Sequence, residues 1–205
     1  MSNINITPLF PTLFTEQHLN IDNQKLVDYA NSLRQQSPSR SGGWQSPWLE
    51  DLTQEPIAQL LDLVQQHWDQ IASEVFSFPQ EITIKITSAW INCNDPGLEQ
   101  LNNNYYHLHG GNFLSSVYYV DCCEQSGNLI LIPPHHFLDY ALPYQLVGEQ
   151  NLFTAQRYHV FAEQGKLVTF PSWINHFAEP NLSNTTRISI AAVSYTHLTL
   201  PTKRI

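Results

Sequence analysis

Three histidines are the clearest sign of chemistry in the sequence. His107 and His109 stand one residue apart in YHLHGG (106–111), and His176 ends the segment PSWINH (171–176). On a β-strand, residues i and i+2 point to the same face, so the imidazoles of His107 and His109 would lie side by side. With His176 as a more distant partner, the three residues predict a metal site.

The arrangement suits iron that reacts with oxygen. Such an ion needs protein ligands on one side and open positions on the other, and the usual set is two histidines and one carboxylate. Here the second position holds His109 in place of Asp or Glu, so we predict a three-histidine set of His107, His109 and His176. His109 has a second interpretation, since it could line the cofactor pocket or orient a ligand through a hydrogen bond.

Arg187 and Ser189 form the second candidate group. They follow His176 and are two residues apart, so on a strand the guanidinium and the hydroxyl would share a face. This pair suits a bidentate grip on a carboxylate, and a buried arginine would require such a partner. The alternative is an ordinary surface ion pair of Arg187. The adjacent His135 and His136 would point in different directions in an extended chain, and we expect them in a surface loop.

The elements that must position these residues are helical in the first half and β-strands in the second. Apolar residues at spacings of three and four predict a helix over 22–33, capped by Asp22, and a longer one that opens at Thr53 with Pro56 in its first turn. From Glu81 the period changes to two and continues to Ile91. Further strands are predicted at 113–120, 128–132, 157–161, 166–170 and 187–192.

These elements predict one domain, mainly β, with a helical part over about 1–78 and a β core over about 79–192. Several short strands separated by turns are typical of a sandwich or jelly roll, with the two helices packed against one sheet. The connection 133–154 has no clear element, and such loops often cover an active site. Trp90, Asn92, Tyr106, Tyr119 and Trp173 are candidate pocket walls.

Composition excludes several classes of partner. The formal net charge is −9, and the nine Lys and Arg residues form no cluster, which argues against a nucleic-acid or anionic membrane partner. The three cysteines have neither a disulfide framework nor a familiar zinc spacing, so we expect a reducing cytoplasm. No apolar run approaches the roughly 18 residues that span a bilayer, and no signal peptide opens the chain.

The last residues of the sequence, 193–205, differ in origin from the rest, as far as their coding pattern indicates. The segment VSYTHLTLPT (193–202) can be encoded by GTCTCTTATACACATCTGACGCTGCCGACG, which resembles the adapter of transposase-based sequencing libraries. We therefore expect residues 193–205 to be an adapter-derived artefact that lies outside the sheet, with the domain ending near Ala192.

Five segments resemble one family of enzymes: SGGWQS (41–46), AWIN (89–92), HLHGGNFLSSVYYV (107–120), GKLVTFPSWINH (165–176) and RISI (187–190). In this order they resemble the 2-oxoglutarate and iron(II)-dependent oxygenases of marine bacteria and their phages. The resemblance implies a double-stranded β-helix, with Fe(II) on His107, His109 and His176 and 2-oxoglutarate anchored by Arg187 with Ser189. The family's pattern usually has Pro where Gly110 stands and Gly where Ser116 stands.

The resemblance predicts a dioxygenase that consumes O2, decarboxylates 2-oxoglutarate to succinate and hydroxylates a small molecule or a protein side chain. One alternative is a cupin-like metal-binding isomerase or sugar-binding module without oxygenase activity. The spacing of Gly165, Pro171 and His176 is close to the second cupin motif, but the Glu that cupins have after the paired histidines is absent. A non-enzymatic virion or interaction protein on the same scaffold is the other alternative.

Overall fold

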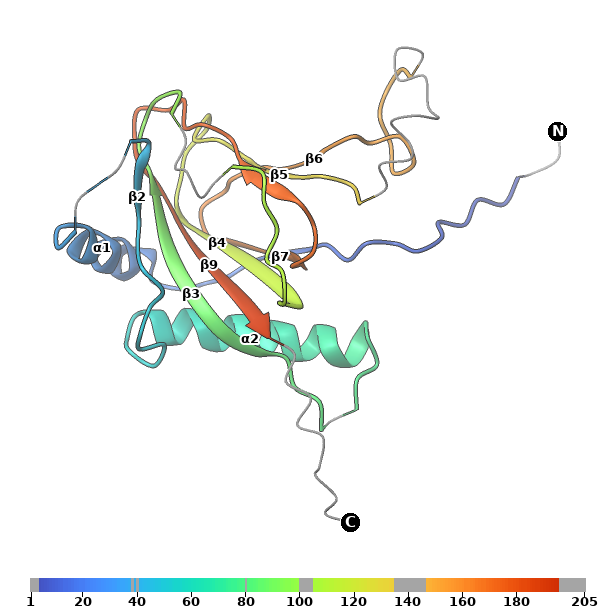
Figure 1. Cartoon of the computed structure of the whole chain (residues 1–205), viewed down its shortest axis with the longest axis horizontal. Helices are drawn as coiled ribbons and strands as arrows, with labels where there is room; N and C mark the ends of the chain where they lie inside the picture. Colours follow the sequence, from blue (N-terminus) through green and yellow to red (C-terminus); the bar gives the residue numbers. More distant parts are fainter. Residues whose placement is uncertain are drawn as a thin grey trace.

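Two antiparallel β-sheets form the body of the protein, and two helices cover one face of the larger sheet (Figure 1). The computed structural model describes residues 4–37, 39, 41–79, 81–99, 105–134 and 147–195. Within them the larger sheet has the order β1-β7-β4-β9-β3-β2, and the smaller has the order β6-β5-β8. The strands are β1 (Thr15–His18), β2 (Gly43–Gln45), β3 (Lys85–Asn94), β4 (Leu114–Asp121), β5 (Leu129–Leu131), β6 (Tyr158–Val160), β7 (Lys166–Pro171), β8 (His176–Ala178) and β9 (Arg187–Tyr195).

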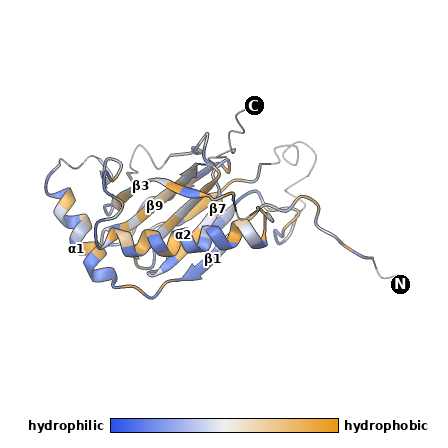
Figure 2. Ribbon diagram, turned by 90° about the horizontal axis from the view of Figure 1, so that it is seen from below, coloured by the Kyte–Doolittle hydropathy of each residue, from blue (hydrophilic) through white to orange (hydrophobic). Residues whose placement is uncertain are grey.

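The helices α1 (Asn23–Arg34) and α2 (Ile57–Glu74) pack on the larger sheet, as the sequence predicted. Figure 2 shows this side, with α2 lying in front of the strands and α1 beside them at the left. Helix α2 buries Leu60, Val64, Trp68 and Ile71 at spacings of three and four residues. Burial of each such side chain contributes about 1.5–3 kcal/mol. The Trp68 indole N–H also donates to the Ser116 hydroxyl of β4 (2.8 Å), which fixes the position of the helix on the sheet.

The predicted start of the first helix is confirmed, whereas that of the second is wrong. Asp22 stands at the N-cap position of α1 but its side chain makes no capping hydrogen bond. Helix α2 begins at Ile57 with Pro56 at its N-cap, and not at Thr53. The reason is local: the backbone N–H and the hydroxyl of Thr53 both donate to the Asp51 carboxylate (2.9 and 2.6 Å), which holds Thr53 in a turn before the helix.

The opposite face of the larger sheet is turned toward the smaller sheet. On this side Tyr119, Val168 and Phe170 pack against Leu129 and other residues of the smaller sheet, which makes a second core between the two layers. The register places Trp90 of β3 opposite Ala191 of β9, and Ala191 opposite Val117 of β4. The central strands therefore offer one row of side chains to the helices and the alternate row to the space between the sheets.

Six strands correspond to predicted runs, although β3 begins at Lys85 rather than near Ile82. Three were not predicted: β1, β2 and β8, of three or four residues each. Strand β2 lies between the two predicted helices, where no element was predicted, and its Trp44 is paired with Cys93. His135, His136 and much of the connection 133–154 lie outside the described residues. In the described part of the chain, no helix is long and apolar enough to cross a membrane.

The expectation that residues 193–195 lie outside the sheet is wrong. Strand β9 continues through Val193 and Ser194 to Tyr195, paired with β3. Ser194 is fully buried, and its hydroxyl accepts a hydrogen bond from the Leu114 N–H (2.7 Å). These three residues are therefore part of the sheet, because they pair with β3 and because the Ser194 hydroxyl binds the backbone of β4. The rest of the tail, 196–205, lies outside the described residues, and its adapter origin stays a prediction.

Candidate active site

The three histidines converge between the two sheets. His107 and His176 form an isolated antiparallel bridge, in which each backbone N–H donates to the other's carbonyl (3.0 and 2.8 Å). The backbone N–H of His109 donates to the Ser172 carbonyl (2.9 Å). One ligand nitrogen from each of the three imidazoles lies within 4.8 Å of the others, so the group could hold a metal ion. Residues 107–109 form only this one bridge and no strand.

Backbone carbonyls orient two of the rings. The Nδ1 atom of His107 is 2.5 Å from the Tyr105 carbonyl, and the Nδ1 atom of His176 is 2.8 Å from the Ile174 carbonyl. In both cases the carbonyl belongs to the residue two positions earlier in the chain. A carbonyl can only accept, so Nδ1 carries the proton and Nε2 keeps its lone pair for a metal. Such a contact also fixes the orientation of a ligand ring.

The environment keeps two of the imidazoles neutral. Burial is the main reason that the pKa of His176 is lowered to about 3; the Ile174 carbonyl opposes this shift, and the neighbouring His107 and His109 add to it. Burial, followed by the proximity of His107, lowers the pKa of His109 to about 4. A neutral imidazole is the form that binds a metal, so at neutral pH neither ring has to lose a proton first.

Arg187 is buried, with only 3% of its surface exposed. Its Nη1 atom donates to the carbonyls of Ser126 (3.0 Å) and Gly127 (2.6 Å), while its Nε atom is buried without a hydrogen-bond partner. Within the described residues no carboxylate lies within ion-pair distance of the guanidinium. Desolvation lowers the pKa of Arg187, as expected for a cation without a close counter-charge. The alternative of a surface ion pair is therefore wrong.

Ser189 belongs to a polar row beside Arg187. In the sheet register Ser189 of β9 lies opposite Asn92 of β3 on one side and Tyr119 of β4 on the other. The Gln45 amide donates to Asn92 Oδ1 (3.0 Å), which extends the row to β2. Burial raises the pKa of Tyr119 to about 12, so its phenol stays protonated. The row thus places uncharged hydrogen-bonding groups next to one buried cation.

One cavity of about 1030 Å³ contains all of these groups, with the histidines, Arg187 and Ser189 in its lining. Four of the five predicted walls also line it: Trp90, Asn92, Tyr106 and Tyr119. Trp90 packs edge-on against the His109 ring, with 5.4 Å between centroids. The fifth predicted wall, Trp173, is wrong, because its side chain is about half exposed and is not part of the cavity lining.

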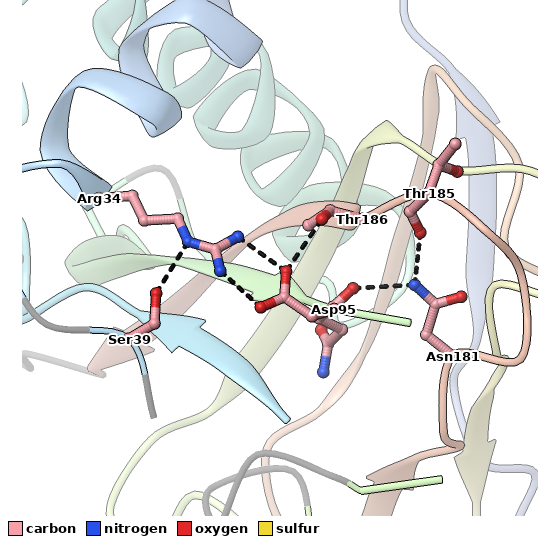
Figure 3. Close-up of polar contacts among 7 residues, drawn as sticks. Arg34, Ser39, Asp95, Asn181, Thr185 and Thr186 are labelled. Atoms are coloured by element: carbon pink, nitrogen blue, oxygen red, sulfur yellow. Dashed lines mark hydrogen bonds and ion pairs between the residues drawn. The ribbon is translucent and has the colours of Figure 1, made fainter. Parts of the chain in front are cut away.

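A network that the sequence did not indicate holds the end of the sheet from which Arg187 emerges (Figure 3). Arg34 of α1 donates two hydrogen bonds to Asp95 (2.8 and 2.5 Å), and Thr186 donates to the same carboxylate (2.9 Å). The Asn181 amide donates to the carbonyls of Asn94 and Thr185 (2.9 and 2.7 Å). The backbone that leads into Arg187 is thereby tied to α1 and to the end of β3.

The profile of a family described as "Putative 2OG-Fe(II) oxygenase" matches residues 88–192, slightly more than half of the chain. The matched region begins on β3, ends on β9 and includes the three histidines, Arg187 and Ser189.

The chain belongs to this family of oxygenases.

Solved structures give the fold independently. A Pseudomonas putida prolyl-4-hydroxylase is 15% identical with a TM-score of 0.59, over 91% of this chain and 94% of that one. A Trichoplax adhaerens prolyl hydroxylase, solved with a peptide of the hypoxia inducible factor, is 15% identical with a TM-score of 0.55, over 89% and 83%. The α-ketoglutarate-dependent epimerase SnoN of nogalamycin biosynthesis is 13% identical with a TM-score of 0.63, over 90% and 78%. The search of curated proteins found no match.

The protein is therefore a 2-oxoglutarate-dependent, non-haem iron oxygenase with the double-stranded β-helix fold that the resemblance implied. Enzymes of this family use Fe(II) and 2-oxoglutarate, and the three histidines are its candidate iron site. The cavity offers both kinds of group that these two components need: neutral imidazoles for a metal, and a buried cation with an unsatisfied donor for a carboxylate.

Proposed function

We propose that the enzyme hydroxylates its substrate at a carbon atom, with Fe(II) held by His107, His109 and His176 and the far carboxylate of 2-oxoglutarate held by Arg187 and Ser189. One observation carries the proposal: Arg187 is buried without a carboxylate partner in the same cavity as the three neutral histidines. An unpaired buried charge is costly, and a bound carboxylate ligand would remove that cost.

Each residue then has a defined task. The carbonyls of Tyr105 and Ile174 hold the rings of His107 and His176 so that Nε2 faces the metal. The carbonyls of Ser126 and Gly127 occupy Nη1 of Arg187, which leaves the other donors of the guanidinium for the carboxylate. Ser189, on the same face of β9, donates its hydroxyl beside them.

The cosubstrate and the metal supply the oxidising chemistry: 2-oxoglutarate loses CO2 and becomes succinate with one atom of O2, and the other atom enters the substrate as a hydroxyl. The protein's contribution is geometry and exclusion of water. Trp90 covers the cavity beside His109, and Phe170 packs against His176 with 4.9 Å between ring centroids. These rings shield the metal end from solvent.

Oxygen consumption and succinate formation test this function. The purified protein, supplied with Fe(II), 2-oxoglutarate and O2, should form succinate slowly without substrate and faster with a substrate from a metabolite panel. His176→Ala should abolish both signals, while His159→Ala, at a partly exposed position outside the cavity, should retain them. A metal-loaded protein that forms no succinate and binds no 2-oxoglutarate would favour a cupin-like function instead.

We also place the enzyme in the cytoplasm. Its three cysteines, Cys93, Cys122 and Cys123, are all free, and cysteines without disulfides fit a reducing compartment. Fractionation of the native host would test this location.

A further inference from the structure

The outer part of the cavity carries information about the substrate, and the inference drawn from it rests on the function proposed above. The cavity, of about 1030 Å³, lies at the upper end of the range of about 300–1,000 Å³ for small-molecule sites. A short dicarboxylic acid on Arg187 fills only its inner end. The remaining space can take a molecule larger than one amino-acid side chain.

The lining is almost free of charge. Among the described residues that line the cavity there is no Asp, Glu or Lys, and Arg187 is the one cation apart from the histidines. A cationic substrate would have no carboxylate to pair with, and an anionic one would compete with 2-oxoglutarate for Arg187. Because a charge moved out of water needs a partner, this lining selects an uncharged substrate.

Uncharged hydrogen-bonding side chains are abundant instead. Seven of them line the cavity: Ser37, Ser39, Gln45, Ser46, Ser88, Asn92 and Asn112. Hydroxyl and amide groups can both donate and accept, so such a surface matches a ligand that also does both. A substrate rich in hydroxyl groups has this property, whereas the ring of a peptidyl proline offers no donor or acceptor.

Aromatic rings mark the mouth of the cavity. Trp48, Tyr105 and Tyr106 all line it, yet 72%, 53% and 53% of their surfaces are exposed. Exposed large rings gathered at a cavity are typical of a binding surface. Trp90, between this mouth and His109, continues the aromatic wall inward. A substrate with a flat face of C–H groups packs well on such rings, while hydroxyl groups at the edge of the substrate reach the polar side chains.

From these three features, we propose that the substrate is a neutral saccharide or the sugar part of a glycoside. One sugar ring packs against the aromatic mouth formed by Trp48, Tyr105 and Tyr106, and the ring to be oxidised lies inward beside Trp90. Its hydroxyl groups bond to the Ser, Asn and Gln side chains. In the balanced reaction one C–H bond becomes C–OH, 2-oxoglutarate becomes succinate and CO2, and O2 is consumed.

The test uses the full chain loaded with Fe(II) and 2-oxoglutarate. Calorimetry without oxygen, and succinate formation with oxygen, would compare four probes: neutral cello- and manno-oligosaccharides, an oligogalacturonate and a (Pro-Pro-Gly) repeat peptide. We expect at least one neutral oligosaccharide to bind and to raise succinate formation at least tenfold, while the oligogalacturonate and the peptide do not. Stimulation by the peptide alone, or by none of the neutral sugars, would overturn the inference.

Substitutions of the aromatic residues at the cavity mouth test the proposed sugar contacts directly. Trp48→Ala should weaken sugar binding at least fivefold and leave the affinities for Fe(II) and 2-oxoglutarate unchanged, and Tyr106→Ala should weaken sugar binding to a similar extent. Trp173→Ala is the matched control, since this half-exposed ring lies outside the lining. Equal sugar affinity in Trp48→Ala, Tyr106→Ala and Trp173→Ala would also contradict the inference. If 2-oxoglutarate itself fails to bind in these samples, it is the proposed function that fails, and the two failures are thus distinguished.

Discussion

The two ends of the cavity are built in different ways. At the histidine end each orienting carbonyl, that of Tyr105 or Ile174, belongs to the residue two positions before its ligand. At the arginine end, Arg187 is held by the carbonyls of Ser126 and Gly127, 60 residues or more away in the chain. The orientation of the imidazole rings therefore depends on local sequence, although the bridge that joins His107 to His176 is long-range. The position of the guanidinium depends on how distant strands and loops are aligned.

This difference predicts that the two ends can be damaged separately. A substitution at the histidine end should remove the metal and leave the sheet intact. A substitution at the arginine end should weaken the cosubstrate, even when the substituted residue never touches it, because the guanidinium is placed by distant backbone groups.

The largest expected effect is the loss of iron in His176→Ala. His176 is buried, and removal of one of three ligands leaves too few to hold Fe(II). Metal analysis after gel filtration should find about one iron per wild-type chain and almost none in the variant. Unchanged thermal unfolding of the metal-free forms would show that only the metal site was lost; stoichiometric iron in the variant would contradict the assignment.

His109→Ala separates the two interpretations of that residue. If His109 is a ligand, its loss should reduce iron affinity by at least tenfold, to an extent comparable with His107→Ala. Its ring is placed by the Ser172 carbonyl through the backbone and by contact with Trp90. Iron binding as tight as in the wild type would assign His109 to the pocket wall.

Gly127→Ala tests the arginine end without touching the cosubstrate. Gly127 has φ +87°, and a Cβ there would lie 2.5 Å from the Glu179 carbonyl oxygen and 2.8 Å from Arg187 Nη1. The guanidinium or the loop must shift, so we expect the KM for 2-oxoglutarate to rise about tenfold with iron binding unchanged.

Gly165→Ala is the matched control for this experiment, since it has φ +84° and its nearest contact would be at an ordinary 3.6 Å. Both variants should lose some stability through the left-handed backbone. Only Gly127→Ala should change the KM. The same KM in both would mean that the loop does not position Arg187.

The smallest effect concerns the network in Figure 3. Hydrogen bonds from Arg34 lower the pKa of Asp95 below its usual 3.8, with a further contribution from Thr186. The folded pKa is depressed, so this contribution to stability is present above about pH 4 and is lost as the pH falls through the folded pKa. Asp95→Asn should destabilise the protein at pH 7 by about 1 kcal/mol, a value that allows for partial exposure of the pair.

Urea unfolding at pH 7 and pH 3 measures that effect. The difference between Asp95→Asn and wild type should shrink at pH 3, while Asp62→Asn, on the exposed face of α2, should differ little from wild type at either pH. If the difference in the free energy of unfolding is the same at both pH values, the charge of Asp95 contributes nothing to stability.

The same contrast explains what could be predicted from the sequence. His107 with His109, and Arg187 with Ser189, are short motifs, and a spacing of two residues on an extended chain is enough to place the side chains of each pair on one face. Long alternating runs such as β3 and β9 are visible for the same reason. Their convergence in one cavity follows from the family resemblance and from the fold it implies.

What could not be predicted is mostly long-range. Strands β1, β2 and β8 are too short to show a period, and they exist because longer neighbours offer them hydrogen bonds. The contacts of Arg187 with the carbonyls of Ser126 and Gly127 involve backbone atoms, so no pattern of side chains in the sequence indicates them. Val193, Ser194 and Tyr195 were assigned to an artefact by their resemblance to an adapter, yet Ser194 pairs with Ile86 of β3 as any strand residue would.

The central claim is that the unpaired buried cation is the anchor of 2-oxoglutarate, and one titration tests it most directly. Calorimetry of the Fe(II)-loaded protein without oxygen should detect 2-oxoglutarate binding in the wild type. Arg187→Ala should bind it at least tenfold more weakly, a change of about 1.4 kcal/mol, with its iron content unchanged. Equal affinity in wild type and Arg187→Ala, or no binding to the iron-loaded wild type, would contradict the account.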